Sequence, residues 1–113
     1  MDRLRKCFLC FVGVTLSGTV YGGSMWTETT VTYTGTYGNG DVYVELAATV
    51  NEPGCTATRF EVPGSNPYSK TVLATALAAL TAGRTIRVWT NGCYGAYPTL
   101  DAGRNSYFFV MDH

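Results

Sequence analysis

Apolar and polar residues alternate in several separate stretches of this chain, a pattern typical of β-strands with one buried face. The alternation is clearest over residues 42–50, where every second residue is apolar. The same pattern predicts further strands over residues 27–37, 55–62, 85–91 and 105–111. Residues 38–41 and 51–54 hold the Gly, Asn and Pro residues that tight turns favour, so they separate the first three strands.

The alternation also assigns side chains to faces of the expected sheet. In the first strand, one parity holds Val31, Tyr33 and Tyr37, and the other holds Thr30, Thr32, Thr34 and Thr36. In the third strand, we expect Thr58, Phe60 and Val62 to point inward, and Arg59 and Glu61 to point outward.

One segment changes from a period of two to a period near 3.6, which predicts a helix over residues 67–82. Asn66 is a suitable N-cap, Pro67 fits the first helical position, and Gly83 is a natural C-terminal stop. The expected apolar stripe consists of Val72, Leu73, Ala76, Leu77 and Leu80.

The resulting order is β-β-β-α-β-β, which makes the chain mainly β with one helix. This order is that of a five-stranded Greek-key barrel of the OB type. A ferredoxin-like sandwich would need a helix between the first two strands, and residues 38–41 leave no room for one. An open meander with the helix across one face is the alternative architecture.

The beginning of the chain has the anatomy of a secretory signal peptide over residues 1–22. A positive head of Arg3, Arg5 and Lys6 precedes an uncharged run over residues 7–20. Gly13, Ser17 and Gly18 make that run a poor membrane span. We therefore expect a secreted or periplasmic product with a single OB-like domain over residues 23–113.

Removal of the signal would leave two cysteines, Cys55 and Cys93. In an oxidising compartment their pairing is the default, and it would close a loop of 39 residues. The chain-entropy model values that closure at about 4 kcal/mol. Two free buried thiols are the alternative. A four-ligand zinc site is not expected, because only His113 could join the two thiols, and no cofactor is implied.

Residues 23–113 carry five basic and seven acidic residues, a net charge of −2. No basic stripe is present, so nucleic acid is not an expected partner. No second apolar run could span a membrane. The chain is not expected to be an enzyme, because its only histidine is the final residue. Its scattered carboxylates leave a two-carboxylate hydrolase as the remote alternative.

Aromatic residues supply the candidate binding site. Trp89 shares the outward parity of Arg87, and an exposed indole stacks well on sugar rings. Tyr94 and Tyr97 lie in the loop that a Cys93 disulfide would anchor, and Tyr43 points outward on the second strand. The alternative is that these aromatic residues only cover a small core.

A small exported domain with one disulfide and a helix before its fourth strand resembles the B subunits of AB5 toxins. Trp26-Thr27, and Thr85-Ile86-Arg87-Val88 directly after the helix, are most similar to the subtilase-cytotoxin and pertussis-like group. The Gly38-Asn39-Gly40-Asp41 hairpin is also similar to those of small exported proteobacterial proteins.

The resemblance implies a homo-oligomeric ring subunit that recognises glycans. An accessory module that binds another exported protein, with no sugar ligand, is the alternative. The last strand fits either reading, because residues 107–111 are apolar on both faces. Such a strand is buried within the monomer or covered by a neighbouring subunit.

Overall fold

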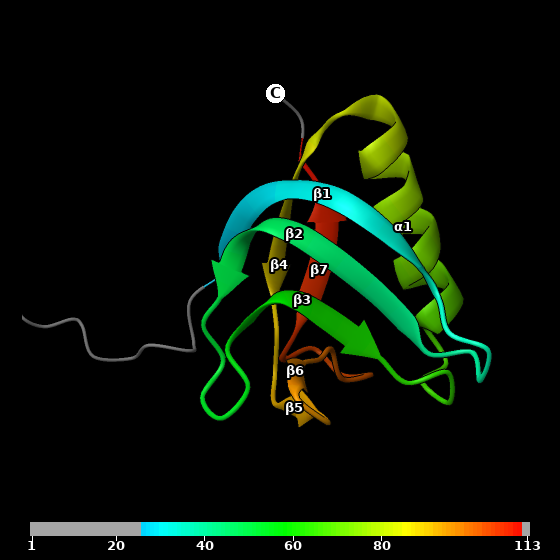
Figure 1. The fold of residues 1–113 in the computed structure, drawn as a ribbon, viewed down its shortest axis with the longest axis vertical. Coiled ribbons are helices and arrows are strands. Elements are labelled where there is room, and N and C mark those ends of the chain that lie inside the picture. Colours follow the sequence, from blue (N-terminus) through cyan, green and yellow to red (C-terminus); the bar gives the residue numbers. More distant parts are fainter. Residues whose placement is uncertain (1–25, 112–113) are drawn as a thin grey trace, which may run out of the picture.

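The computed structural model describes residues 26–111. The expected signal peptide, residues 1–22, and the C-terminal His113 lie outside the described residues. The elements are β1 (Thr27–Thr36), β2 (Val42–Val50), β3 (Ala57–Val62), α1 (Ser69–Ala82), β4 (Thr85–Trp89), β5 (Cys93–Tyr94), β6 (Tyr97–Pro98) and β7 (Tyr107–Val110) (Figure 1).

Five strands form one antiparallel sheet in the order β3-β2-β1-β4-β7. Strand β1 belongs to both halves of this sheet. Its first four residues pair with β4, and its later residues, from Val31 onward, pair with β2 (Figure 1). Within residues 26–111, β3 and β7 are the two ends of the sheet and share no ladder with each other.

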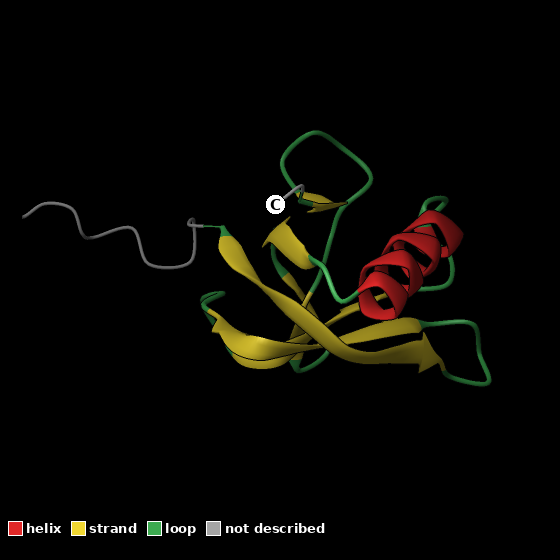
Figure 2. Cartoon of the chain, turned by 90° about the horizontal axis from the view of Figure 1, so that it is seen from above, coloured by secondary structure: helices red, strands yellow, loops and turns green. Residues whose placement is uncertain are grey.

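The hydrophobic core lies between one face of the curved sheet and α1, which packs on β1, β2 and β7 (Figure 2). Val44, Phe60 and Ile86 are completely buried there. The rings of Phe60 and Phe108 meet edge to face with centroids 5.1 Å apart, so the core joins the two end strands. Mainly β structure with one helix is therefore confirmed.

The helix differs in detail from the sequence prediction. It begins at Ser69, two residues later than expected, and ends at Gly83, whose φ of 64° is left-handed. Its buried positions include Ala76 and Ala79, whereas Leu77 and Leu80 are 45% and 37% exposed. The prediction that these two leucines belong to the buried stripe was wrong. The buried face follows Val72, Ala76 and Ala79, and each leucine comes one residue after a buried alanine, which turns it about 100° around the helix axis.

The segment expected from the sequence to be a loop, which holds Tyr94 and Tyr97, contains the short β5–β6 hairpin. Gly95 takes a left-handed φ of 64° in its turn, a conformation that glycine adopts without steric cost. The hairpin packs against β3 through β6, and Pro98 is buried. The hairpin therefore lies beside β3.

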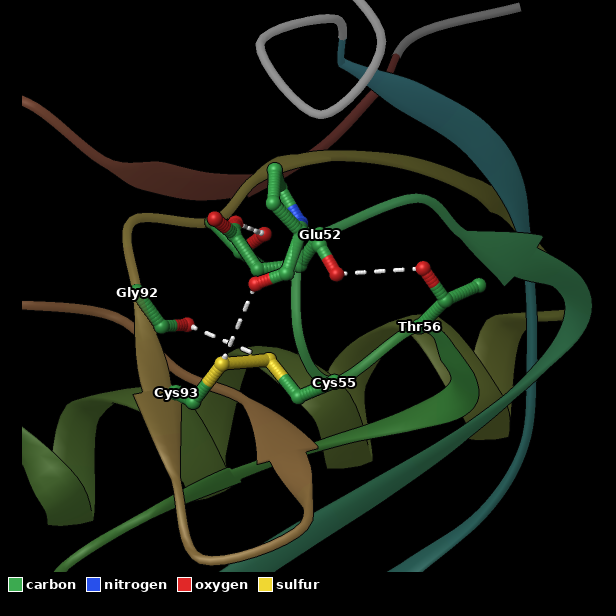
Figure 3. The surroundings of a disulfide bond; sticks show 7 residues. Glu52, Cys55, Thr56, Gly92 and Cys93 are labelled. Carbon is green, nitrogen blue, oxygen red and sulfur yellow. Dashed lines mark hydrogen bonds between the residues drawn. A yellow bond between two sulfur atoms is a disulfide. The ribbon is translucent and has the colours of Figure 1, made fainter.

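The predicted disulfide between Cys55 and Cys93 is confirmed, with Cα atoms 6.0 Å apart (Figure 3). Close by, the carbonyl of Glu52 accepts hydrogen bonds from the amide of Cys55 and the hydroxyl of Thr56, both at 3.0 Å. The carboxylate of Glu52 accepts a buried hydrogen bond of 2.6 Å from Thr90. Covalent and polar links thus hold the β4–β5 connection against the loop before β3.

Candidate functional site

The sheet face that points away from α1 gathers tyrosines from three elements. Tyr33 of β1 lies opposite Glu45 of β2, and Tyr43 of β2 lies opposite Gly35. Because side chains alternate between faces, these residues share the outer face. We call the following set the tyrosine surface: Tyr33, Tyr37, Tyr43, Arg59 and Tyr97.

A β-bulge in β1 decides which tyrosines reach this face. Val31 pairs with Leu46 but Tyr33 pairs with Glu45, so Thr32 is an extra residue on the bulged strand. The bulge breaks the parity that the sequence suggested, leaving Val31 buried while Tyr33 is 48% exposed. Tyr37, which directly follows the last residue of β1, is 42% exposed.

Arg59 is the centre of the tyrosine surface. Its Nε donates to Glu45 at 2.9 Å, and its Nη1 donates to Glu61 at 3.4 Å. It also donates to the hydroxyls of Tyr37 at 2.9 Å and of Tyr33 at 2.8 Å. Burial alone would lower the pKa of Arg59, but hydrogen bonds to Glu45, Tyr33 and Glu61 outweigh it and raise that pKa. The guanidinium is therefore permanently charged and fixed in orientation.

Three tyrosine rings surround the same guanidinium. The Cζ atom of Arg59 lies 4.9 Å from the ring centroid of Tyr43, 5.5 Å from that of Tyr33 and 5.7 Å from that of Tyr97. These distances fall within the range of cation–π attraction. Tyr97 comes from the β5–β6 hairpin, so the guanidinium links the sheet to the hairpin.

Gly35 provides the space that Tyr43 occupies. A Cβ atom at this position would lie 2.6 Å from the Tyr43 hydroxyl, closer than side chains tolerate. The Tyr43 ring can therefore lie across β1, where its centroid is 5.0 Å from that of Tyr37.

Asp41, in the β1–β2 turn, joins the edge of this surface to two other loops. It accepts a hydrogen bond from the Gly64 amide at 2.9 Å and one from the Tyr94 hydroxyl at 2.9 Å. The Gly64 amide first, and the Tyr94 hydroxyl second, lower the pKa of Asp41. The hydrogen bond from Tyr94 to Asp41 also raises the pKa of Tyr94, because it favours the protonated phenol. Asp41 is thus an ionised acceptor at neutral pH.

Glu61 was expected to point outward, and its side chain lies on the outer face but is covered. The residue is only 7% exposed, and its carboxylate accepts a 2.7 Å hydrogen bond from Tyr37. This bond to Glu61 raises the pKa of Tyr37. Thr58, in contrast, is exposed and donates to Glu45 at 2.7 Å, so its expected inward orientation was wrong.

A second aromatic group lies on β4, β7 and the chain just before β1. We call the following set the tryptophan surface: Trp26, Arg87, Trp89, Tyr107 and Phe109. The Cζ atom of Arg87 lies 4.8 Å from a ring centroid of Trp26 and 5.8 Å from that of Phe109. Glu28 accepts a 2.8 Å hydrogen bond from Arg87 and pairs with its guanidinium. Trp89 and Tyr107 pack edge to face at 5.5 Å.

The five residues proposed from the sequence are divided between the two surfaces. Tyr43 and Tyr97 belong to the tyrosine surface, and Tyr94 reaches its edge through Asp41. Arg87 and Trp89 belong to the tryptophan surface, on a different pair of strands.

Sequence reasoning missed the central residue, Arg59, and the two most exposed tyrosines of its surface, Tyr33 and Tyr37. The outward parity of Arg59 was visible in the sequence, but nothing in the local pattern indicated which rings would surround it. The bulge that exposes Tyr33 has no clear sequence signal.

A cleft of about 450 Å³ lies apart from the tyrosine surface, between α1 and the loop before β7. Val72, Leu100 and Phe108 contribute its apolar lining. Asp101 also lines it, but the carboxylate of Asp101 is bonded to Asn91 and to other groups of its own loop.

Within residues 26–111, no group of three or more His, Cys, Asp or Glu side chains is placed to hold a metal ion. No helix in that part of the chain has the length and apolar character to cross a membrane. No protein-family model, curated protein or solved structure matches this chain significantly.

Proposed function

We propose that this chain is an exported, non-catalytic binding module that recognises carbohydrate through the tyrosine surface. The observation that carries the proposal is the position of two half-exposed rings, Tyr33 and Tyr37, on either side of a fixed guanidinium. A sugar ring offers C–H groups to an aromatic face and hydroxyls to planar polar groups. The tyrosine surface offers both kinds of partner side by side.

The side chains of the tyrosine surface are held in fixed conformations, which favours binding. Arg59 is held by four hydrogen bonds, and the hydroxyls of Tyr33 and Tyr37 each accept one of them. Side chains that are already fixed lose little rotamer entropy when a ligand arrives. A weak ligand such as a single sugar unit benefits most from this saving.

The topology supports an OB-like interpretation of the fold. A first strand shared between two half-sheets, and a helix between the third and fourth long strands, are features of that fold. OB-folds bind oligosaccharides on the face of strands 2 and 3, between the loop after strand 1 and the loop after strand 4. In support of this interpretation, Tyr43 lies on β2, Arg59 lies on β3, and Tyr97 lies in the connection that follows β4.

Export and the resemblance to AB5 toxin B subunits belong to the same proposal. A Cys55–Cys93 disulfide is compatible with an oxidising compartment, such as the periplasm or the cell exterior. N-terminal sequencing of the protein recovered from those fractions should place the mature start near residue 23. Recovery of the intact leader from the cytosol would contradict export.

The carbohydrate proposal is tested on a glycan array followed by titration calorimetry. Wild-type protein should bind at least one class of glycan, and Tyr33→Ala and Tyr37→Ala should each weaken binding at least tenfold. Trp89→Ala, on the tryptophan surface, is the matched control and should leave affinity within twofold. An array without any bound glycan, or a loss confined to Trp89→Ala, would overturn the proposal.

A second candidate function is contact with protein, including a further copy of this chain. It is favoured by Trp26 and Phe109, which are 48% and 42% exposed, and by the position of Phe109 on β7, an end strand of the sheet. Exposed aromatic side chains next to a strand with one unpaired edge are typical of protein interfaces. Native mass spectrometry of wild type and Phe109→Asp tests this. An oligomer that the variant abolishes supports it, and a monomeric wild type contradicts self-association.

A further inference from the structure

Within the tyrosine surface and directly bonded to it or to its edge lie one positive and three negative side chains. Arg59 is the positive group, and its guanidinium is bonded to the carboxylates of Glu45 and Glu61. Asp41 is the third carboxylate and reaches the surface through Tyr94. The surface taken together with these three carboxylates therefore has a net charge of −2.

The guanidinium has little capacity left for an anionic ligand. Four hydrogen bonds to protein oxygens already engage it. A ligand carboxylate that replaced Glu61 would leave that nearly buried carboxylate without its cation, a costly arrangement. Arg59 thus acts here as a frame for the tyrosine rings and does not serve as an anion receptor.

The other cationic side chains of the described residues belong to other elements. Lys70 and Arg84 lie in α1 and directly after it, Arg87 is paired with Glu28 on the tryptophan surface, and Arg104 lines the cleft beside α1. An anion that approached the tyrosine surface would therefore meet three carboxylates and only one cation, Arg59, which is already paired with two of them.

We propose that the tyrosine surface selects neutral glycans and rejects their sialylated or sulfated forms, an inference that rests on the carbohydrate-binding function proposed above. Two net negative charges about 7 Å from an anionic sugar reduce its affinity about tenfold in dilute buffer. Salt screens this repulsion, so the difference should shrink to a few fold at physiological ionic strength.

The test uses a glycan array on which each core occurs in neutral, sialylated and sulfated form. Neutral cores should bind, and their acidic forms should bind at least tenfold more weakly at low salt. The methyl ester of the sialylated form of the best core separates charge from size. Recovery of most of the lost affinity by the ester supports the inference, and an ester as weak as the acid overturns it.

Charge-neutralising variants provide the second arm of the experiment. Asp41→Asn should reduce the neutral-to-acidic affinity ratio about threefold, because it removes one negative charge from the edge of the surface. Glu28→Gln removes the same charge on the tryptophan surface and should leave the ratio unchanged. Acidic glycans that bind as well as neutral ones would overturn this inference alone, whereas an empty array would overturn the proposed function with it.

Discussion

Replacement of Arg59 by Met tests the central role of this residue in the tyrosine surface. Met keeps most of the apolar stem and removes the guanidinium. Exposed ion pairs contribute about 0–1 kcal/mol, whereas the loss of one partner from a buried pair costs about 3–5 kcal/mol. The side chains of Arg59, Glu45 and Glu61 are 19%, 20% and 9% exposed, which is between these limits. We expect Arg59→Met to lower the free energy of unfolding by about 2 kcal/mol.

Urea denaturation at pH 7 measures this loss, and a double-mutant cycle assigns it. Glu61→Gln removes the charge that Arg59→Met would leave unpaired, so the double variant should lose about 1 kcal/mol less than the sum of the single losses. Arg87→Met is the matched control, because its partner Glu28 is 39% exposed, and it should cost less than about 1 kcal/mol. Equal losses for the two arginines, or an additive cycle, would show that Arg59 and Glu61 do not stabilise each other.

Three further predictions concern the frame of the site. Replacing Cys55 and Cys93 together by Ala should lower the unfolding free energy by about 4 kcal/mol, because the bridge spans 38 positions; a urea-denaturation loss below about 1 kcal/mol would contradict this. Gly64→Ala should lower Tm by several degrees, since its Cβ would lie 2.9 Å from backbone of the β1–β2 turn, whereas Gly38→Ala, with open space around it, should not. The carboxylate bonded to Tyr94 raises the pKa of that phenol, so this bond stabilises the fold below pH 10 and is lost as the pH rises through the folded-state pKa. Unfolding measured from pH 9 to 12 should therefore show a weaker pH dependence in Tyr94→Phe.

Local patterns of the sequence were enough to predict the five long strands in their order along the chain, the single helix and the Cys55–Cys93 pair. Each of these depends on neighbouring residues or on composition. Strand alternation, turn residues and helix periodicity are encoded within about ten positions, and two cysteines in one oxidised domain have only one intramolecular partner. The same information indicated that Tyr43 and Arg59 point outward.

Contacts between side chains that are far apart in the sequence depend on the three-dimensional fold. The bulge at Thr32 depends on the pairing of β1 with β2, and it moves Tyr33 to the outer face while Val31 stays inside. Tyr97 reaches Arg59 because a hairpin 38 positions further along the chain folds back on β3. Trp89, grouped with Tyr97 by sequence proximity, lies on another part of the sheet. Register and long-range packing are properties of strand pairs, so no single stretch of the chain contains them.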